Sequence, residues 1–210
     1  MDLGLIEGTA FHHRFEPGSS DAKNCLVLLH GTGGDESQLI EFGRAIDPNA
    51  HLLGLRGRSN EEGRNRFFRR YGEGVFDEHD IKMQCHDLCL FLAIALKQYH
   101  VDATVTALGF SNGANMAASM MLLYPSVFER CLLFRSILPI MPEILPDLNG
   151  KSIFMVNGDE DSLGPQELAE NLARLFRECG AEVEARLIHG KHALTQTDVQ
   201  LASAWINSQS

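Results

Sequence analysis

Two kinds of hydrophobic pattern alternate along the chain. Short apolar or β-branched runs indicate strands, because they are too brief for helices. Such runs occupy residues 25–29, 51–55, 104–108, 131–137, 152–158 and 182–188. Longer segments repeat apolar residues every three or four positions, which predicts helices that bury one face. These segments begin at residue 35 or 36, 77, 112, 165, and 195 or 197, and they run to about residues 46, 100, 124, 179 and 205.

The order of these segments predicts the fold. Strand and helix alternate from residue 25 onward, which is typical of a mostly parallel central sheet with helices on both faces. Residues 10–17 are expected to add an antiparallel strand at one edge. No internal repeat or linker is visible, so we predict one α/β domain over residues 1–210.

The segment from residue 56 to residue 75 breaks the alternation. It is polar, rich in glycine and arginine, and without a clear period, which predicts a long loop. Long loops inside compact domains are often functional. Six arginines stand in its first part: Arg56, Arg58, Arg64, Arg66, Arg69 and Arg70.

Composition then excludes several classes of protein. The formal net charge is −10, and an acidic surface repels the phosphate backbone of nucleic acids. No apolar run is long enough to span a membrane, and the first residues lack the pattern of a secretory signal. We expect a cytoplasmic protein without a nucleic-acid partner or stable membrane association. The sequence leaves the oligomeric state open, and a homodimer is compatible with it.

The five cysteines are expected to be small core residues in a reducing compartment, because their number is odd and they are scattered. Cys85 and Cys89 lie one helical turn apart beside His86, a spacing that a metal site also uses. No second pair of ligands follows at a suitable distance. We therefore predict no metal site and no cofactor.

Candidate chemistry begins at residues 109–113, Gly-Phe-Ser-Asn-Gly, between an expected strand and an expected helix. A tight turn there would lift the hydroxyl of Ser111 above the sheet, beside a helix N-terminus that favours developing negative charge. The alternative is a glycine-rich turn with an incidental serine. The flanking strand and helix favour a nucleophile.

A serine nucleophile needs a base and an orienting carboxylate. Downstream of Ser111 the chain has two histidines, of which His192 lies in the loop before the last helix and is preferred to His189. After the strand at 152–158, Asp161 is preferred to Asp159 as the carboxylate. Each of these residues has an ordinary alternative as a solvated turn residue.

Acyl transfer also needs donors for an oxyanion. The backbone N–H of Asn112, directly after the serine, is one expected donor. The second is the N–H of Thr32 in the glycine-rich loop "LLHGTGG" after the first buried strand. His30 in this loop precedes the serine and is expected to make structural hydrogen bonds.

Together these motifs resemble the α/β-hydrolase superfamily, in particular its small carboxylesterase/phospholipase/thioesterase branch, which has almost no lid. The resemblance rests on "LLHGTGGDE", "RFFRRYGEGVFDEHDI", "GFSNGANMA", "NGDEDSLGP" and "KHALT", and it covers nearly the whole chain. The second motif is similar to that of bacterial hydrolases associated with hydroquinone and catechol resistance. The resemblance places nucleophile, acid and base on Ser111, Asp161 and His192. One departure is Lys191, which stands where the family usually has glycine before its histidine.

We therefore expect a serine hydrolase that cleaves carboxylic esters of small to medium acyl chains through an acyl-enzyme, with a small-molecule ester as its partner. The segment between the strands at 131–137 and 152–158 is too short for a helical cap, so the site should be open. An acyl-thioesterase or lysophospholipase would use the same triad. A non-catalytic ligand-binding homologue is an alternative of another class.

The arginine-rich segment is expected to influence substrate choice. Phe68 would supply an apolar wall, while Arg69 or Arg70 would bias the site toward small aromatic or anionic esters. The alternative is that these arginines pair with nearby acids and only hold the loop. The nearby acids are Glu61, Glu62 and Glu73.

Overall fold

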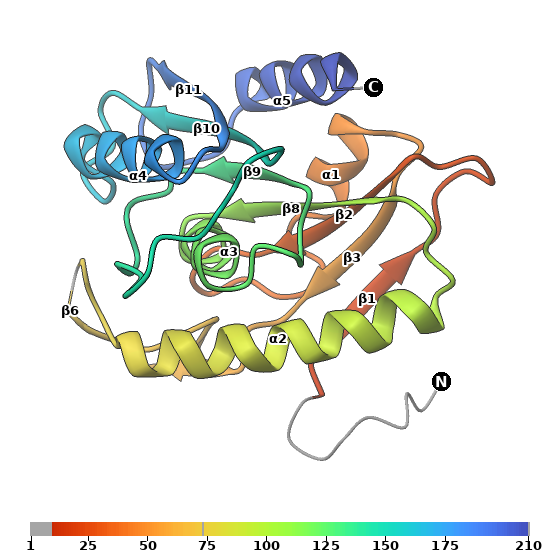
Figure 1. Cartoon of the computed structure of the whole chain (residues 1–210), viewed down its shortest axis with the longest axis horizontal. Coiled ribbons are helices and arrows are strands. Elements are labelled where there is room, and N and C mark those ends of the chain that lie inside the picture. The colour runs from red at the N-terminus through yellow and green to blue at the C-terminus, as the bar shows by residue number, and fades with distance from the viewer. Residues whose placement is uncertain (1–9, 73, 210) are drawn as a thin grey trace.

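A computed structural model describes residues 10–72 and 74–209, and its centre is a seven-stranded sheet (Figure 1). In spatial order the strands are β1 (His13–Glu16), β3 (His51–Leu55), β2 (Asn24–Leu29), β8 (Thr104–Phe110), β9 (Arg130–Phe134), β10 (Ser152–Gly158) and β11 (Glu182–Ile188). Strand β1 pairs antiparallel with β3, and all other neighbours in this sheet are parallel. The predicted fold class and the antiparallel edge strand are confirmed.

Helices cover both faces of the sheet. They are α1 (Ile40–Ile46), α2 (Glu78–Gln98), α3 (Asn112–Leu123), α4 (Gln166–Glu178) and α5 (Gln196–Ser208). Helices α2, α3 and α4 lie on one face and α1 and α5 on the other (Figure 1). Successive side chains of a strand point to opposite faces, so Val27 and Leu29 of β2 join one apolar cluster and Leu26 and Leu28 the other. This double burial explains why β2 is apolar throughout.

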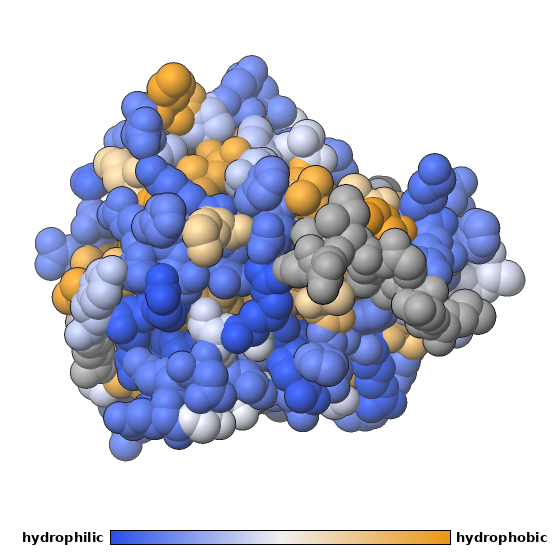
Figure 2. Space-filling model, turned by 90° about the horizontal axis from the view of Figure 1, so that it is seen from below, coloured by the Kyte–Doolittle hydropathy of each residue, from blue (hydrophilic) through white to orange (hydrophobic). Residues whose placement is uncertain are grey.

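Helix α2 forms one side of the molecule. The side chain of Asp77 accepts a hydrogen bond from the N–H of Asp80 and caps the helix, in agreement with the predicted start at residue 77. Most side chains on this side are hydrophilic, and hydrophobic ones occur in small groups (Figure 2). Among the described residues no helix is both long enough and apolar enough to cross a membrane.

Several predicted boundaries move. Helix α1 begins at Ile40 because residues 36–39 form turns, and α5 continues to Ser208. Pro165 precedes the first helical residue of α4 instead of occupying that position. Strand β9 ends at Phe134, three residues before its predicted end, because Arg135 has a φ of 58° and turns the chain away.

The long loop predicted for residues 56–75 contains regular structure, which occupies residues 59–72 and 74–76. They form two antiparallel hairpins, the first from β4 (Ser59–Glu61) and β5 (Arg64–Arg66), the second from β6 (Arg70–Gly72) and β7 (Val75–Phe76). Glu62 and Gly63 have φ values of 52° and 81°, the backbone that a tight two-residue hairpin turn requires. These strands are short and mostly polar, so no hydrophobic period reveals them.

A buried ion pair ties the end of β9 to α5. Both carboxylate oxygens of Asp198 accept hydrogen bonds from Arg135, at 2.8 and 2.9 Å, and both side chains are fully buried. Asp198 also accepts from the backbone N–H and the hydroxyl of Thr195, which caps α5. The remaining donors of Arg135 reach the carbonyl oxygens of Val156 at 3.2 Å, of Lys191 at 3.2 Å and of Ala193 at 2.8 Å. One guanidinium thus joins β9, β10, α5 and the loop that carries His192.

His30, at the end of β2, holds the glycine-rich loop beside β3. Its Nε2 accepts a hydrogen bond from the N–H of Gly57 at 3.0 Å, so the proton sits on Nδ1, which donates to the carbonyl of Gly31 at 2.6 Å. Burial lowers the pKa of His30 below 6.5. The ring is therefore neutral in the folded protein, and its expected structural role agrees with this geometry.

We predict that Asp198→Asn lowers the free energy of unfolding by about 3–5 kcal/mol, because it leaves the buried guanidinium of Arg135 without its counter-charge. Urea unfolding measures this loss. Glu143→Gln is the matched control, since it removes the carboxylate of an exposed ion pair with Lys82 and should cause no measurable change. Equal unfolding midpoints for Asp198→Asn and the parent would contradict the prediction.

A second prediction concerns pH. The unfolded chain protonates His30 near pH 6.5 while the folded chain resists it, so this contribution to stability is complete above pH 6.5 and is lost as the pH falls below that value. In the variant His30→Gln, the side-chain amide can make the hydrogen bonds to Gly31 and Gly57 but does not titrate. Between pH 7.5 and pH 5.5 the free energy of unfolding of the parent should therefore fall more than that of the variant, as measured by urea titration. Parallel losses in the two proteins would refute this assignment.

Candidate active site

Ser111 stands in the sharp turn between β8 and α3, with a φ of 52° and a ψ of −115°. Glycines make this turn sterically accessible. A Cβ atom on Gly113 would lie 2.0 Å from the carbonyl oxygen of Leu29, and one on Gly109 would lie 2.5 Å from the Cα of Ala114. The predicted spacing of glycine around the serine therefore has a direct packing cause.

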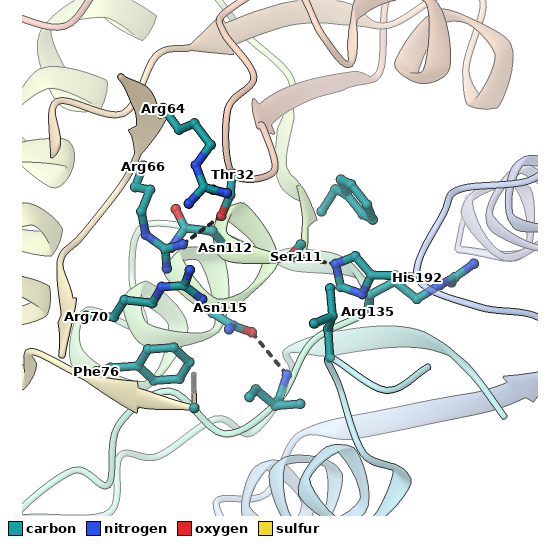
Figure 3. Close-up of a pocket in the computed structure, with 14 residues that line it drawn as sticks. Thr32, Arg64, Arg66, Arg70, Phe76, Ser111, Asn112, Asn115, Arg135 and His192 are labelled. Carbon is teal, nitrogen blue, oxygen red and sulfur yellow. Dashed lines mark hydrogen bonds between the residues drawn. The ribbon is translucent and has the colours of Figure 1, made fainter. Parts of the chain in front are cut away.

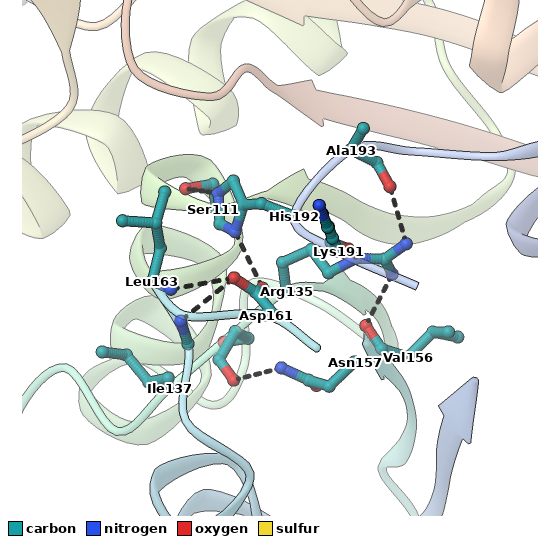
Figure 4. A network of polar contacts seen from close by, with 12 residues as sticks. Ser111, Arg135, Ile137, Val156, Asn157, Asp161, Leu163, Lys191, His192 and Ala193 are labelled. Atoms are coloured by element: carbon teal, nitrogen blue, oxygen red, sulfur yellow. Dashed lines mark hydrogen bonds and ion pairs between the residues drawn. The ribbon is translucent and has the colours of Figure 1, made fainter. Parts of the chain in front are cut away.

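His192 connects Ser111 to Asp161 (Figure 4). Its Nε2 lies 2.9 Å from the hydroxyl oxygen of Ser111, and its Nδ1 lies 2.8 Å from Oδ2 of Asp161. The other carboxylate oxygen accepts from the N–H groups of Leu163 and Gly164, at 3.0 and 3.3 Å, which fixes its orientation. The carboxylate is fully buried, whereas the imidazole is about one quarter exposed (26%).

The alternative acid and base pair with one another outside this chain of contacts. His189 is 81% exposed, and its Nδ1 lies 3.3 Å from the carboxylate of Asp159. That hydrogen bond raises the pKa of His189, and the N–H of Gly190, together with His189, lowers the pKa of Asp159. The structure thus brings Ser111 together with the preferred residues and not with these two.

Thr32 and Asn112 line the same cavity as Ser111. Their backbone N–H groups have no hydrogen-bond acceptor among the described residues. The side chain of Asn112 accepts from the N–H of Phe67 at 2.7 Å, and the hydroxyl of Thr32 accepts from Arg66 at 2.8 Å. The two free donors beside Ser111 are suited to an oxyanion.

These groups open into a cavity of about 600 Å³ (Figure 3). Apolar contributions come from Phe76, Phe110, Ile137 and Leu163, and polar ones from Thr32, Arg64, Arg66, Arg70, Ser111, Asn112, Asn115, Arg135 and His192. A cavity of this volume accommodates a small molecule. Its wall combines an apolar part with an unusual number of guanidiniums.

Two of the three residues predicted to bind substrate lie elsewhere. Phe68 is fully buried in the core and does not line the cavity. Arg69 is 60% exposed beside Asp77 and Asp80, also away from the cavity. Arg70 does line it. Phe68 and Arg69 lie in the segment that joins the two hairpins, whereas Arg70 begins β6, so an assignment made without knowledge of the hairpins selects the wrong neighbours.

The sequence-based prediction missed Arg64 and Arg66 as cavity residues. Both belong to β5, on the hairpin that packs beside the glycine-rich loop, where Gly33 N–H donates to the carbonyl of Asn65 at 2.9 Å. The Glu-Gly pair at 62–63 is the sequence signal that could have revealed the hairpin.

Several arginines of residues 56–70 also pair with acidic side chains, which is the alternative role expected from the sequence. Arg56 contacts Glu36, and Arg58 contacts Asp87. Arg70 contacts Glu61. Glu73, another predicted partner, lies outside the described residues.

The cysteine pair on α2 does not form a ligand set. Cys85 is buried with its sulfur 3.4 Å from that of Met116, whereas His86 is exposed. Burial raises the pKa of Cys89 to about 12, so this thiol stays protonated at neutral pH. Among residues 10–72 and 74–209, no group of three or more His, Cys, Asp or Glu side chains is arranged to hold a metal ion.

Comparison with known proteins agrees with this geometry. A model of the phospholipase/carboxylesterase family matches residues 72–210. The Bacillus subtilis (strain 168) protein named "Putative hydrolase MhqD" is 42% identical over 194 residues, which cover 92% of this chain and 96% of that relative. The crystal structure of the Bacillus cereus carboxylesterase matches with a TM-score of 0.92 and 35% identity over 95% of each chain. A structure of YahD with malic acid matches with a TM-score of 0.89 and 30% identity, covering 96% of this chain and 100% of that one. The chain therefore belongs to the phospholipase/carboxylesterase family of hydrolases, the branch of the α/β-hydrolases that its motifs resemble.

Proposed function

We propose that this protein is a serine hydrolase that cleaves carboxylic esters through an acyl-enzyme on Ser111. The observation that carries the proposal is the continuous hydrogen-bonded chain from the Ser111 hydroxyl through His192 to buried Asp161, at the wall of a cavity. A nucleophile, a base and an orienting group in this arrangement perform acyl transfer in unrelated proteins.

In the proposed reaction Nε2 of His192 takes the hydroxyl proton while the oxygen of Ser111 attacks the ester carbonyl. Asp161 accepts the hydrogen bond from Nδ1, which sets the tautomer and stabilises the imidazolium. The N–H groups of Thr32 and Asn112 donate to the oxyanion. His192 then gives its proton to the departing alcohol, and a water molecule, activated by the same imidazole, releases the acid.

The wall of the cavity supports small to medium acyl groups. Residues 135–151, between β9 and β10, contain no helix and form no cap domain, although Ile137 contributes to the wall. The lack of a helical cap in this segment supports the proposal of an open site. The names of the relatives, a carboxylesterase and a protein observed with malic acid, support a carboxylic ester of a small acid.

A thioesterase or a lysophospholipase would use the same groups, and a non-catalytic homologue would keep the fold without turnover. Labelling with a fluorophosphonate separates catalysis from mere binding, because the reagent reacts covalently only with an activated serine. The folded parent should be labelled, and Ser111→Ala should not. An unlabelled folded parent would support the non-catalytic alternative.

We predict that Ser111→Ala and His192→Ala each reduce kcat for a short-chain p-nitrophenyl ester by at least about 10⁴-fold, and that the double variant is no worse, since the groups act as a unit. Steady-state kinetics on folded variants measures this. His189→Ala is the matched control, because the exposed ring of His189 hydrogen-bonds to Asp159 and not to Ser111, and it should keep the parent rate. A large loss in His189→Ala with a small loss in His192→Ala would reverse the assignment of the base.

A further prediction concerns chain length. Without a cap to cover a long chain, kcat/KM should decline from butanoate to dodecanoate esters, and emulsified substrate should give no activation over monomeric substrate. Kinetics with p-nitrophenyl esters of graded length, below and above their solubility limits, measures both effects. A rise in rate at the solubility limit would contradict the open site.

A further inference from the structure

The reaction geometry assigns the two ends of an ester to different sides of the cavity, provided that the proposed function holds. His192 must protonate the departing alcohol, so the alcohol lies on the histidine side of Ser111. Thr32 and Asn112 face the oxyanion. The acyl chain is then directed away from His192. Figure 3 shows that this side is occupied by Arg64, Arg66 and Arg70.

These three arginines share few counter-charges. Glu61 lies 2.9 Å from Arg70, 3.6 Å from Arg66 and 3.7 Å from Arg64, and Glu62 reaches only Arg64, at 3.9 Å, with a side chain that is 87% exposed. Among the described residues, three guanidiniums face two carboxylates, which leaves this part of the cluster with one net positive charge. No other carboxylate in the described part of the chain lies within ion-pair distance of these three arginines.

Arg66 is nearly buried, with a side chain that is 4% exposed. Desolvation, followed by the repulsion of Arg70, lowers the pKa of Arg66 to about 10, which leaves it charged at neutral pH. A buried cation costs free energy unless an anion compensates for it. The single carboxylate of Glu61 compensates the charges of Arg64, Arg66 and Arg70 together.

Donors remain available in this part of the wall. Arg70 uses its Nε for Glu61, and its two terminal nitrogens have no hydrogen-bond acceptor among the described residues. The side-chain nitrogen of Asn112 is likewise buried without a partner there. The planar fork of arginine matches the two oxygens of a carboxylate.

We propose that Arg64, Arg66 and Arg70 form an anion subsite for the acyl end of the substrate, and that the preferred substrates are half-esters of small dicarboxylic acids. The free carboxylate binds the guanidiniums, and the ester carbonyl at the other end of the same acyl chain lies at Ser111. Hydrolysis breaks the acyl carbon–oxygen bond, adds water and yields the dicarboxylic acid and the alcohol. One net positive charge matches one carboxylate better than a phosphate dianion. Phe76, in the same wall, is suited to the methylene chain between the two ends.

The test compares two substrates of the same shape: monoethyl glutarate and its neutral isostere, in which a carboxamide replaces the free carboxylate. The parent should show a kcat/KM at least about tenfold higher for the half-ester, the size expected of a charge-assisted hydrogen bond. This preference should decrease as salt is added. Arg70→Gln should reduce the ratio of the two kcat/KM values toward one. Arg69→Gln, which alters an exposed arginine outside the cavity, is the matched control and should keep the ratio.

A second measurement does not depend on turnover. Calorimetric titration of glutarate into Ser111→Ala protein should show binding that weakens at least about tenfold when Arg70→Gln is added and is unchanged when Arg69→Gln is added. Circular dichroism verifies that the variants are folded.

Each contrary outcome has its own meaning. Ester hydrolysis that needs Ser111 but shows no preference for the half-ester overturns the subsite and leaves the proposed function intact. Hydrolysis of no ester by folded parent contradicts the proposed function, while glutarate binding still tests the subsite. Preference for a carboxylate on the alcohol side, measured with propionyloxyacetate, or for a phosphonate in place of the carboxylate, overturns the assignment to acyl carboxylates.

Discussion

The ion pair between Arg135 and Asp198 holds the histidine loop in place. His192 lies in a segment without regular structure between β11 and α5, so local backbone hydrogen bonds alone do not fix its position. Arg135 contacts the carbonyl oxygens of Lys191 and Ala193, the residues on either side of the histidine. Because these contacts are to the main chain, the side chain at position 191 is free to vary. Lys191 is exposed and can replace the glycine usual in the family without moving His192.

Two residues with left-handed backbone stand next to each other at the ends of neighbouring strands. Ser111 follows β8 with a φ of 52°, and Arg135 follows β9 with a φ of 58°. The N–H of Ser111 donates to the carbonyl of Phe134 at 2.9 Å, so the two turns are coupled. Such conformations cost about 1–3 kcal/mol each and persist only where the surroundings determine them. Close packing at Gly113 holds the backbone of Ser111 in this conformation, and the buried ion pair with Asp198 holds that of Arg135.

Sequence reasoning succeeded where local rules govern position. The alternation of strands and helices predicted the sheet, and the glycines around Ser111 predicted its turn, since both are written in short segments. His192 and Asp161 followed from their places after strand ends, although their catalytic roles remain proposals. The failures lie where tertiary contacts decide. Phe68 stands in the bend between the two hairpins and packs into the core, whereas Arg66, at the end of β5, reaches the cavity. No local sequence pattern separates these two positions.

Arg135 shows a different limit of the sequence. It stands directly after an apolar strand, and nothing nearby in the chain shows that its counter-charge is Asp198 on the last helix. Long-range pairs of this kind need the fold before they can be seen. The same holds for the arginines of the hairpins, whose partners could be guessed as nearby acids but whose orientation toward Ser111 could not.

The charge balance of the cavity also bears on how products would leave. Ester hydrolysis turns a neutral ester group into a carboxylate, so the product carries one more negative charge than the substrate. Guanidiniums that hold a half-ester would hold the dicarboxylate product at least as well, and slow release limits turnover. Glu61 opposes this by lowering the net charge of the arginine cluster, while its hydrogen bond orients Arg70. Its own pKa is lowered, first by the hydrogen bond from Arg70, so it stays ionised and repels a second carboxylate. Because Glu61 is part of the proposed anion subsite, the subsite favours an acyl group with a single negative charge. The same carboxylate weakens retention of the more negative product.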